Sequence, residues 1–171
     1  MKKWTLRIFL LFIIAALGYY VYPEAALPVN TKIDRLVVTK GKRIMQAYSR
    51  GQLIKTYKIS IGQNPWGDKQ FEGDKRTPEG EYTINDRNEH SSYHKNLGVS
   101  YPNKADKEEA VKKGLNPGGE IKIHGLRNGL GFLGKFHRIF NWTAGCIAVT
   151  NAEIDELCSA VTMGTPIVIN P

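Results

Sequence analysis

Cys146 is the residue best suited to covalent chemistry in this chain, and it lies in the stretch HRIFNWTAGCIAVTNAEIDEL. Four roles are open to it: a small buried hydrophobe, one half of a disulfide, a metal ligand or a nucleophile. Free cysteine is among the most buried residue types, so a core position beside the apolar run 147–149 is the default interpretation. The surrounding residues must decide among these roles.

The chain has one other cysteine, Cys158. Ile154, Leu157, Cys158 and Val161 follow the i, i+3, i+4, i+7 spacing that is typical of the buried face of a helix. Two cysteines alone do not make a disulfide framework, even in a compartment that permits disulfides. We therefore expect Cys158 to lie in the core and Cys146 to be unpaired.

A cysteine nucleophile needs a base or a cation nearby. A thiol with an ordinary pKa of about 8.5 is only a few per cent thiolate at neutral pH. His124 ends the expected strand EIKIHG, and Gly125 permits a close turn after it. A histidine at a strand end and a cysteine at a strand edge can face each other across adjacent strands, although such a pair is a weak signal by itself. The other histidines are His90, His94 and His137.

His90 and His94 have the i, i+4 spacing of a metal-binding pair on a helix. They fall in the stretch NEHSSYHKN, which we expect to be a polar loop, and the sequence offers no obvious third ligand. The sequence therefore predicts no metal site and no cofactor.

Residues 1–27 have the pattern of a membrane segment and a linker. Three basic residues precede an uncharged apolar run from Ile8 to Tyr22, and a helix over 4–22 spans about 28 Å, enough for a bilayer core. The candidate cleavage site Glu24-Ala25-Ala26 has a carboxylate where a small residue is needed, which favours an uncleaved anchor over a cleaved signal peptide. We expect an inner-membrane anchor with the folded part, residues 28–171, in the periplasm or outside the cell.

The net charge of +8 favours anionic partners. Residues 1–27 carry +2 of it, which leaves +6 on the exported part. We expect no nucleic-acid partner, because an exported domain rarely meets nucleic acid and the basic residues are dispersed without interleaved aromatic residues. Cell-wall polymer, with its many carboxylates, fits the compartment better.

Short strands and few helices are expected after the linker. The β-branched and aromatic runs between Ile33 and Gly62 are broken at Lys40-Gly41 and Arg50-Gly51, which indicates a three-strand meander. The polar stretch 62–79 is rich in Gly and Pro and is expected to be a long loop.

A second set of patterns completes the expected fold. Thr150 and Glu153 have the T-x-x-E spacing of a capping box, which predicts a helix ending near Gly164. The other expected elements are strands at 80–85, 97–101, 120–124, 147–149 and 166–169 and a charged helix at 105–113. One domain follows, mainly β with short helices, in a sandwich-like or barrel-like arrangement.

The motifs resemble those of a known family. IKIHG followed by WTAGCIAVTN, with RTPEGEYTI upstream and GTPIVI near the end, is similar to the L,D-transpeptidase catalytic domain of bacterial cell-wall enzymes. The resemblance runs from about Ile33 to Ile169, and it implies that family's fold over residues 28–171. YHKNLGVSYPNKADKEEAVKKGLNPGGEIKIHG further resembles one branch of the family.

The resemblance implies acyl transfer on peptidoglycan stem peptides. Cys146 would attack the carbonyl at the L-centre of the third-residue diaminopimelate, D-alanine would leave, and the thioester would pass to an amine or to water. His124 would take the thiol proton and later protonate the leaving amine. The backbone N–H groups of Gly145 and Cys146 would stabilise the oxyanion, where a side chain at Gly145 would crowd the tetrahedral centre.

Two positions depart from the family pattern. Ala144 stands where the family often has His or Asn, and Ala148 stands where it often has Arg. Because a guanidinium is the usual grip on a substrate carboxylate, we expect another cation, Arg138 or failing that Arg127, to take this role. The residues expected to contact substrate are Arg138, His137, Thr143, Trp142 and Gly125.

Two alternatives to transpeptidation stay open. A hydrolase of the same fold, an L,D-carboxypeptidase or an amidase, would pass the acyl group from stem peptides or their protein cross-links to water. A non-catalytic wall-binding domain would keep the fold without the reaction, although the intact pair of Cys146 and His124 argues against it.

Overall fold

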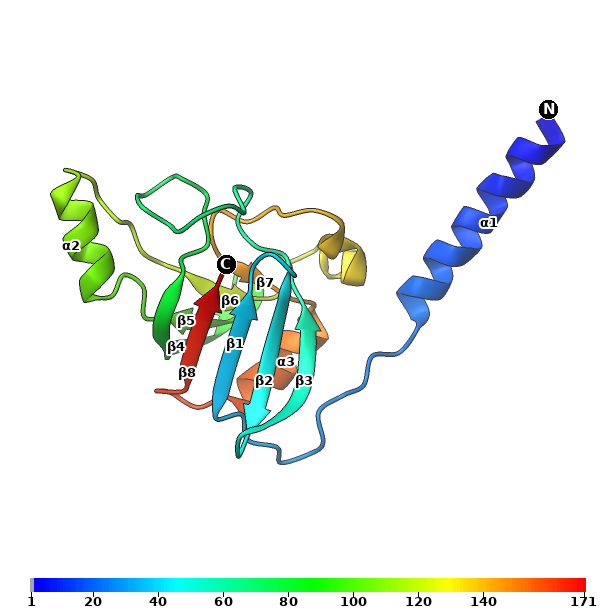
Figure 1. Cartoon of the computed structure of the whole chain (residues 1–171). Helices are drawn as coiled ribbons and strands as arrows, with labels where there is room; N and C mark the ends of the chain where they lie inside the picture. Colours follow the sequence, from blue (N-terminus) through cyan, green and yellow to red (C-terminus); the bar gives the residue numbers. More distant parts are fainter. Residues whose placement is uncertain (1) are drawn as a thin grey trace.

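The structure is a computed structural model that describes residues 2–171. It is built on one eight-stranded mixed sheet in the order β3-β2-β1-β8-β4-β5-β6-β7, curled into a half-barrel (Figure 1). The elements are α1 (Lys2–Val21), β1 (Arg35–Thr39), β2 (Ile44–Ser49), β3 (Gln52–Lys58), β4 (Gly80–Ser91), β5 (His94–Val99), α2 (Lys104–Lys112), β6 (Lys122–His124), the 3₁₀ segment η1 (Gly131–Ile139), β7 (Ile147–Ala148), α3 (Asn151–Ala160) and β8 (Pro166–Asn170).

The meander expected between 33 and 62 is confirmed as β1, β2 and β3, which pair antiparallel. The C-terminal strand β8 then pairs parallel to β1 and antiparallel to β4, so it joins the two halves of the sheet. Alternate residues of β1 and β8, among them Leu36 and Ile167, are fully buried in the core. Burial at every second residue is the pattern of a strand with one face on the core. The mainly β, barrel-like fold is confirmed.

β4 is the strand that bends the sheet. Its first part, Gly80–Thr83, pairs with β8, and the remainder pairs with β5. The register shifts between Ile84 and Asp86, which marks a bulge where the sheet turns.

The prediction of a polar loop over NEHSSYHKN was wrong. These residues form the end of β4, a tight turn at Ser92 and Tyr93, and the start of β5, with Ser91 opposite His94. Residues 85–90 of β4 are exposed, so they lack the apolar alternation that identifies a strand in a sequence. The hairpin extends past the core, which is why its sequence looks like a loop.

The two predicted helices are present. α3 begins at a capping box in which the Thr150 side chain accepts from the Glu153 backbone N–H and the Glu153 carboxylate accepts from the Thr150 N–H. It packs on the sheet with Leu157 and Cys158 buried, which confirms Cys158 as a core residue. α2 is capped by Asn103 and ends just before Gly114, whose φ of 67° suits glycine.

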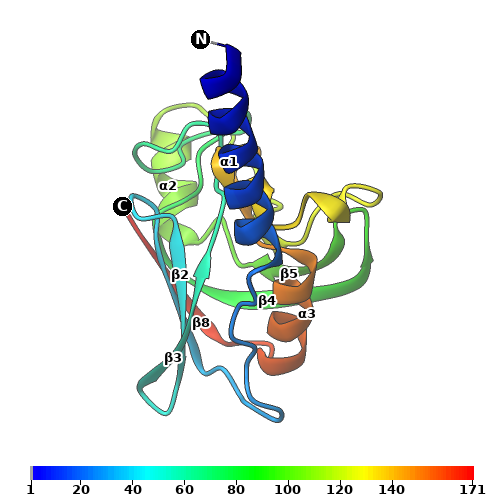
Figure 2. The same cartoon turned by 90° about the vertical axis from the view of Figure 1, so that its right-hand side faces the viewer.

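α1 extends away from the sheet as a single helix (Figures 1 and 2). It is long and apolar enough to cross a membrane, a test that a signal sequence also passes. Such a helix points to secretion or to the cell envelope. Its C-terminal end contacts η1, where the ring of Tyr20 stacks on Phe136 with 5.5 Å between centroids.

Candidate active site

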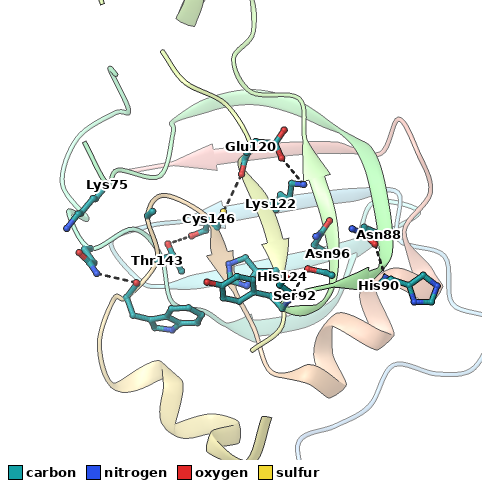
Figure 3. Close-up of a pocket in the computed structure, with 15 residues that line it drawn as sticks. Lys75, Asn88, His90, Ser92, Asn96, Glu120, Lys122, His124, Thr143 and Cys146 are labelled. Atoms are coloured by element: carbon teal, nitrogen blue, oxygen red, sulfur yellow. Dashed lines mark hydrogen bonds and ion pairs between the residues drawn. The ribbon is translucent and has the colours of Figure 1, made fainter. Parts of the chain in front are cut away.

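Cys146 and His124 are brought to one pocket by the last two strands of the sheet. β6 and β7 are parallel, with Ile123 opposite Ile147 and His124 opposite Ala148. Successive residues of a strand point to opposite faces, so Cys146, two residues before Ala148, shares a face with His124 in a diagonal position. Both side chains line a pocket of about 570 Å³ (Figure 3). The register places the two side chains on one face of the sheet, and their pairing as base and nucleophile stays a prediction.

The imidazole of His124 is fixed in one tautomer. Its Nδ1 atom lies 2.7 Å from the carbonyl oxygen of Gly125. A carbonyl only accepts, so Nδ1 carries the hydrogen and Nε2 is left with its lone pair. The rings of Tyr93 and Trp142 lie 4.7 and 5.6 Å from the imidazole and limit its rotation. Burial lowers the pKa of His124, which keeps the ring neutral and able to accept a proton.

The thiol of Cys146 is neutral in the resting site. Burial raises its pKa, and the backbone N–H and ammonium group of Lys122 oppose that shift only in part. Sγ lies 3.5 Å from the carbonyl oxygen of Glu120, to which the thiol donates. A half-buried neutral thiol in the same pocket as a neutral imidazole could act as a nucleophile only by losing its proton at the moment of attack.

Gly145 allows the chain to pass close to the loop 62–79. Its φ is +133°, and a Cβ there would lie 2.7 Å from the carbonyl oxygen of Arg76. Thr143 braces the same turn, because its hydroxyl accepts from the Gly145 N–H at 3.2 Å and donates to the Cys146 carbonyl at 2.7 Å. The Gly145 N–H is therefore engaged, whereas the Cys146 N–H has no hydrogen-bond partner among residues 2–171.

Lysines supply the positive charge of the pocket. Lys75 and Lys122 both line it, and Lys122 pairs with the exposed carboxylate of Glu120 at 2.8 Å, which raises the lysine pKa. Sequence reasoning missed both residues. Lys122 alternates with buried Ile123 in the strand pattern KIH, so the sign that it shares a face with His124 was available in the sequence.

Comparison with known proteins shows which family has this arrangement. The sequence profile of the L,D-transpeptidase catalytic domain, YkuD, matches residues 33–169. The chain belongs to this family. The match confirms the resemblance inferred from IKIHG and WTAGCIAVTN.

Individual relatives agree with the assignment to the L,D-transpeptidase family. The chain is 31% identical over 131 residues to the putative L,D-transpeptidase YafK of Escherichia coli K12, a match that covers 73% of this chain and 46% of YafK. The structure of the helical cell shape determining protein Pgp2 from Campylobacter jejuni is similar with a TM-score of 0.61 and 25% identity, over 82% of this chain and 48% of Pgp2. The chain thus spans about half the length of these relatives.

Two further structures share the fold. Bd1075 of Bdellovibrio bacteriovorus has a TM-score of 0.58 at 24% identity, over 85% of this chain and 50% of that chain. An L,D-transpeptidase from Xylanimonas cellulosilytica has a TM-score of 0.54 at 15% identity, over 85% of this chain and 64% of that chain. The half-barrel is therefore the fold of L,D-transpeptidase structures.

The structure shows the surroundings of Ala148, which stands where the L,D-transpeptidase pattern often has arginine, and of Arg138, which was expected to replace that arginine. Ala148 is fully buried, and its backbone N–H and carbonyl pair with Ser60 at 2.8 and 3.0 Å. Arg138, expected to replace that arginine, does not line the pocket. Its buried guanidinium pairs with Glu153 at 2.7 Å and with both oxygens of Glu24 at 2.6 and 3.1 Å. The pairing with Arg138 lowers the pKa of Glu24 to about 2.

The other residues expected to contact substrate divide into two groups. Thr143 and Trp142 line the pocket. His137 and Gly125 do not: His137 lies behind Trp142, with 3.4 Å between its Nδ1 and the indole nitrogen, and Gly125 accepts from His124. His137 therefore supports the indole from behind, and Gly125 orients the imidazole.

The structure does not assemble a metal centre from the histidine pair. Among residues 2–171, no three side chains of His, Cys, Asp or Glu lie close enough together to hold a metal ion. His94 instead lies 2.9 Å from the Asp155 carboxylate. His90 does not share this partner; it lines the active-site pocket.

Proposed function

We propose that this protein is a cysteine-dependent acyl transferase of peptidoglycan stem peptides, with Cys146 as nucleophile and His124 as general base. The observation that carries the proposal is the diagonal placement of the two side chains on β6 and β7 in one pocket. The neutral resting state of both groups and the fixed His124 tautomer support it.

The first half of the reaction forms a thioester. His124 Nε2 accepts the thiol proton as Cys146 Sγ attacks the carbonyl carbon of the third-residue diaminopimelate. The developing oxyanion is stabilised by the unpartnered N–H of Cys146. His124 then gives its proton to the departing nitrogen, and D-alanine leaves. Gly145, whose N–H is engaged by Thr143, contributes its backbone shape.

The second half regenerates the thiol. An amine or a water molecule loses a proton to His124 Nε2 and attacks the thioester, and the proton returns to the sulfur of Cys146. An amine acceptor gives a new cross-link, and water gives a shortened stem peptide. Both reactions use the same residues, so the products of the experiment described below identify the acyl acceptor.

Lys122 and Lys75 are the groups that we propose for the substrate carboxylates. Both line the pocket, and Lys122 lies on β6 two residues before His124. Ammonium groups bind carboxylates as point charges, so they do not need the bidentate geometry of a guanidinium. Thr143 and Trp142 line the same wall and are proposed to contact the peptide.

We also propose that α1 is retained as an inner-membrane anchor and that the catalytic domain, residues 28–171, lies in the periplasm or outside the cell. The apolar helix α1, which has no charged residue after Arg7, supports this arrangement. The contacts of Tyr20 and Glu24 with η1 and Arg138 support it as well. The apolar helix would then hold the enzyme at the inner face of the wall.

Incubation of the purified full-length protein with a disaccharide-tetrapeptide, followed by intact-mass analysis, tests the proposed reaction. We expect a covalent adduct that lacks the terminal D-alanine and disappears in Cys146→Ala. Cys158→Ala is the matched control, because the other cysteine is buried in the core and its removal should leave the adduct in place. A folded protein that forms neither adduct nor product would contradict the proposal.

A further inference from the structure

The segment 130–140 exposes an unusual run of large apolar side chains. Phe132, Ile139 and Phe140 are 68%, 69% and 62% exposed, and Leu130 and Leu133 are exposed beside them. Elsewhere in the folded part, the exposed large apolar residues of the described chain occur at separated positions. A concentration of this kind marks an interaction surface.

The segment lies against the C-terminal end of α1. Tyr20 stacks on Phe136 and donates from its hydroxyl to the Phe132 carbonyl at 2.8 Å. The Lys135 ammonium group donates to the Tyr22 carbonyl and lies 5.7 Å from the ring centre of Tyr19. The exposed apolar side chains are therefore next to the end of the apolar helix.

The contacts between α1 and η1 fix the position of η1 along the normal of a bilayer that α1 crosses. The candidate span ends at Val21, and tyrosines at the end of a span lie at the membrane–water interface. Because Tyr19 and Tyr20 touch Phe136, η1 lies at the same level. α1 points away from the sheet, and α2 is far from it (Figure 1).

The charge of the segment suits a lipid surface. Residues 126–142 contain no Asp or Glu. Of their basic residues, Arg127 is exposed, whereas Arg138 is buried against Glu24 and Glu153 and Lys135 lies 3.9 Å from Glu24. Segments that join exposed aromatic and aliphatic residues to basic ones bind at the interface of membranes with anionic lipids. Arg138 also ties the segment to Glu24, just after α1, and to Glu153 of α3.

We propose that Leu130, Phe132, Leu133, Ile139 and Phe140 insert into the outer leaflet of the membrane that α1 crosses, so that the catalytic domain rests on the lipid surface. The proposal depends on the proposed anchoring by α1. Leu130, Leu133 and Phe140 also line a cavity of about 330 Å³ whose wall includes Tyr93 and Trp142, two residues that line the active-site pocket as well. The active site thus opens beside the membrane and meets the stem peptides nearest to it.

A fluorescent label reports this contact in the full-length protein. Phe132→Cys and Phe140→Cys are made in a Cys146→Ser chain and labelled with an NBD fluorophore, while Cys158 stays buried. Val111→Cys is the matched control, because Val111 is also exposed and belongs to α2, a helix that lies far from α1 (Figure 1). The protein is reconstituted at low density in vesicles of phosphatidylethanolamine and phosphatidylglycerol.

The proposal expects blue-shifted emission from labels at positions 132 and 140 and at least about twofold quenching by nitroxide-labelled lipids. The label at position 111 should emit as in water. If the protein resists carbonate extraction but the labels at positions 132 and 140 emit as in water, the proposal that this surface inserts into lipid is overturned and the anchor is not. If carbonate extracts the protein, the proposed anchoring by α1 is overturned. A blue shift without lipid quenching would show that the labels lie against protein and would overturn the lipid proposal.

Discussion

His124 donates the hydrogen on Nδ1 to the carbonyl oxygen of Gly125, the residue that follows it, across 2.7 Å. The contact closes at the end of β6, where a Cβ on Gly125 would lie 2.8 Å from the side-chain oxygen of Asn151. The absence of a side chain at Gly125 therefore leaves room for the Asn151 side chain against this strand end. Orientation of the base is built into the strand end itself.

Removal of this imidazole should abolish most of the activity. We expect His124→Ala to lower kcat/KM for the tetrapeptide by about 10²–10⁴, the usual contribution of a general base. The Cys146 thiol, whose pKa is raised by burial, would then have no group to take its proton. Steady-state kinetics on the folded variant measure this. Activity that survives nearly unchanged would show that another residue is the base, with His137 the next candidate.

The pH dependence of kcat/KM should show where His124 titrates. Only the neutral imidazole accepts the thiol proton, and burial lowers the pKa of His124 from 6.5. Activity should therefore be retained at pH 6.5 and lost as the pH falls below that value. A rate profile from acidic to neutral pH measures the limb, with circular dichroism as the control for folding. A limb centred above pH 6.5 would contradict the assignment.

Gly145→Ala should damage the turn that carries the nucleophile. The new Cβ would lie 2.7 Å from the Arg76 carbonyl in a backbone conformation with φ of +133°, so the turn and the Cys146 N–H must move. We expect kcat to fall by about 10²–10³, as for loss of an oxyanion donor. Gly51→Ala is the control, because Gly51 also has a positive φ but has open space around it. Equal kinetic effects of the two substitutions would exclude a specific role for the Gly145 turn.

The parts of the fold that the sequence predicted are those in which local patterns and burial agree. Three features were predicted in this way: the meander, the helix capped by Thr150 and Glu153, and the core position of Cys158. Each has its own local sequence pattern, and packing on the sheet adds only burial. The β4–β5 hairpin was missed because its exposed strand lacks apolar alternation. η1 was missed because Gly134, with φ of 46°, interrupts the helical backbone within it.

The candidate site divides in the same way. That Cys146 and His124 lie in one pocket could be predicted, because their types and the neighbouring glycines limit the chemistry open to them. The order given to the loop cations, Arg138 before Arg127, had no local pattern behind it, because a basic residue in a loop gives no sign of its partner. Arg138 finds two carboxylates, one of them at Glu24, 114 residues away in sequence. A pairing over that distance is set by tertiary packing and leaves no local pattern.

Lys122→Ala tests the proposed grip on the substrate. Loss of a charge-assisted contact costs about 1.5–3 kcal/mol, so kcat/KM should fall by about tenfold to a hundredfold. Lys122→Arg should restore part of the activity because it keeps the charge. Lys104→Ala is the control, since Lys104 is highly exposed on α2 and outside the pocket. Unchanged kinetics in Lys122→Ala would leave Lys75 as the carboxylate-binding group.

Arg138 distinguishes the sequence-based hypothesis from the role that its contacts indicate. A direct grip on the substrate predicts that Arg138→Ala lowers kcat/KM by about tenfold to a hundredfold with the fold intact. The observed pairing predicts a different result. Arg138 and Glu153 have side chains that are each 5% exposed, so removing the guanidinium leaves a buried carboxylate without its cation, at a cost of about 3–5 kcal/mol in the free energy of unfolding.

Denaturant unfolding and kinetics on the same Arg138→Ala protein decide between these roles. We expect a large loss of stability, with kcat/KM of the folded protein within about threefold of the parent. Arg138→Ala combined with Glu153→Gln should recover part of the stability, because the amide has no charge to bury and keeps an acceptor for the Thr150 N–H. A stable Arg138→Ala protein with a much lower kcat/KM would instead return Arg138 to the substrate.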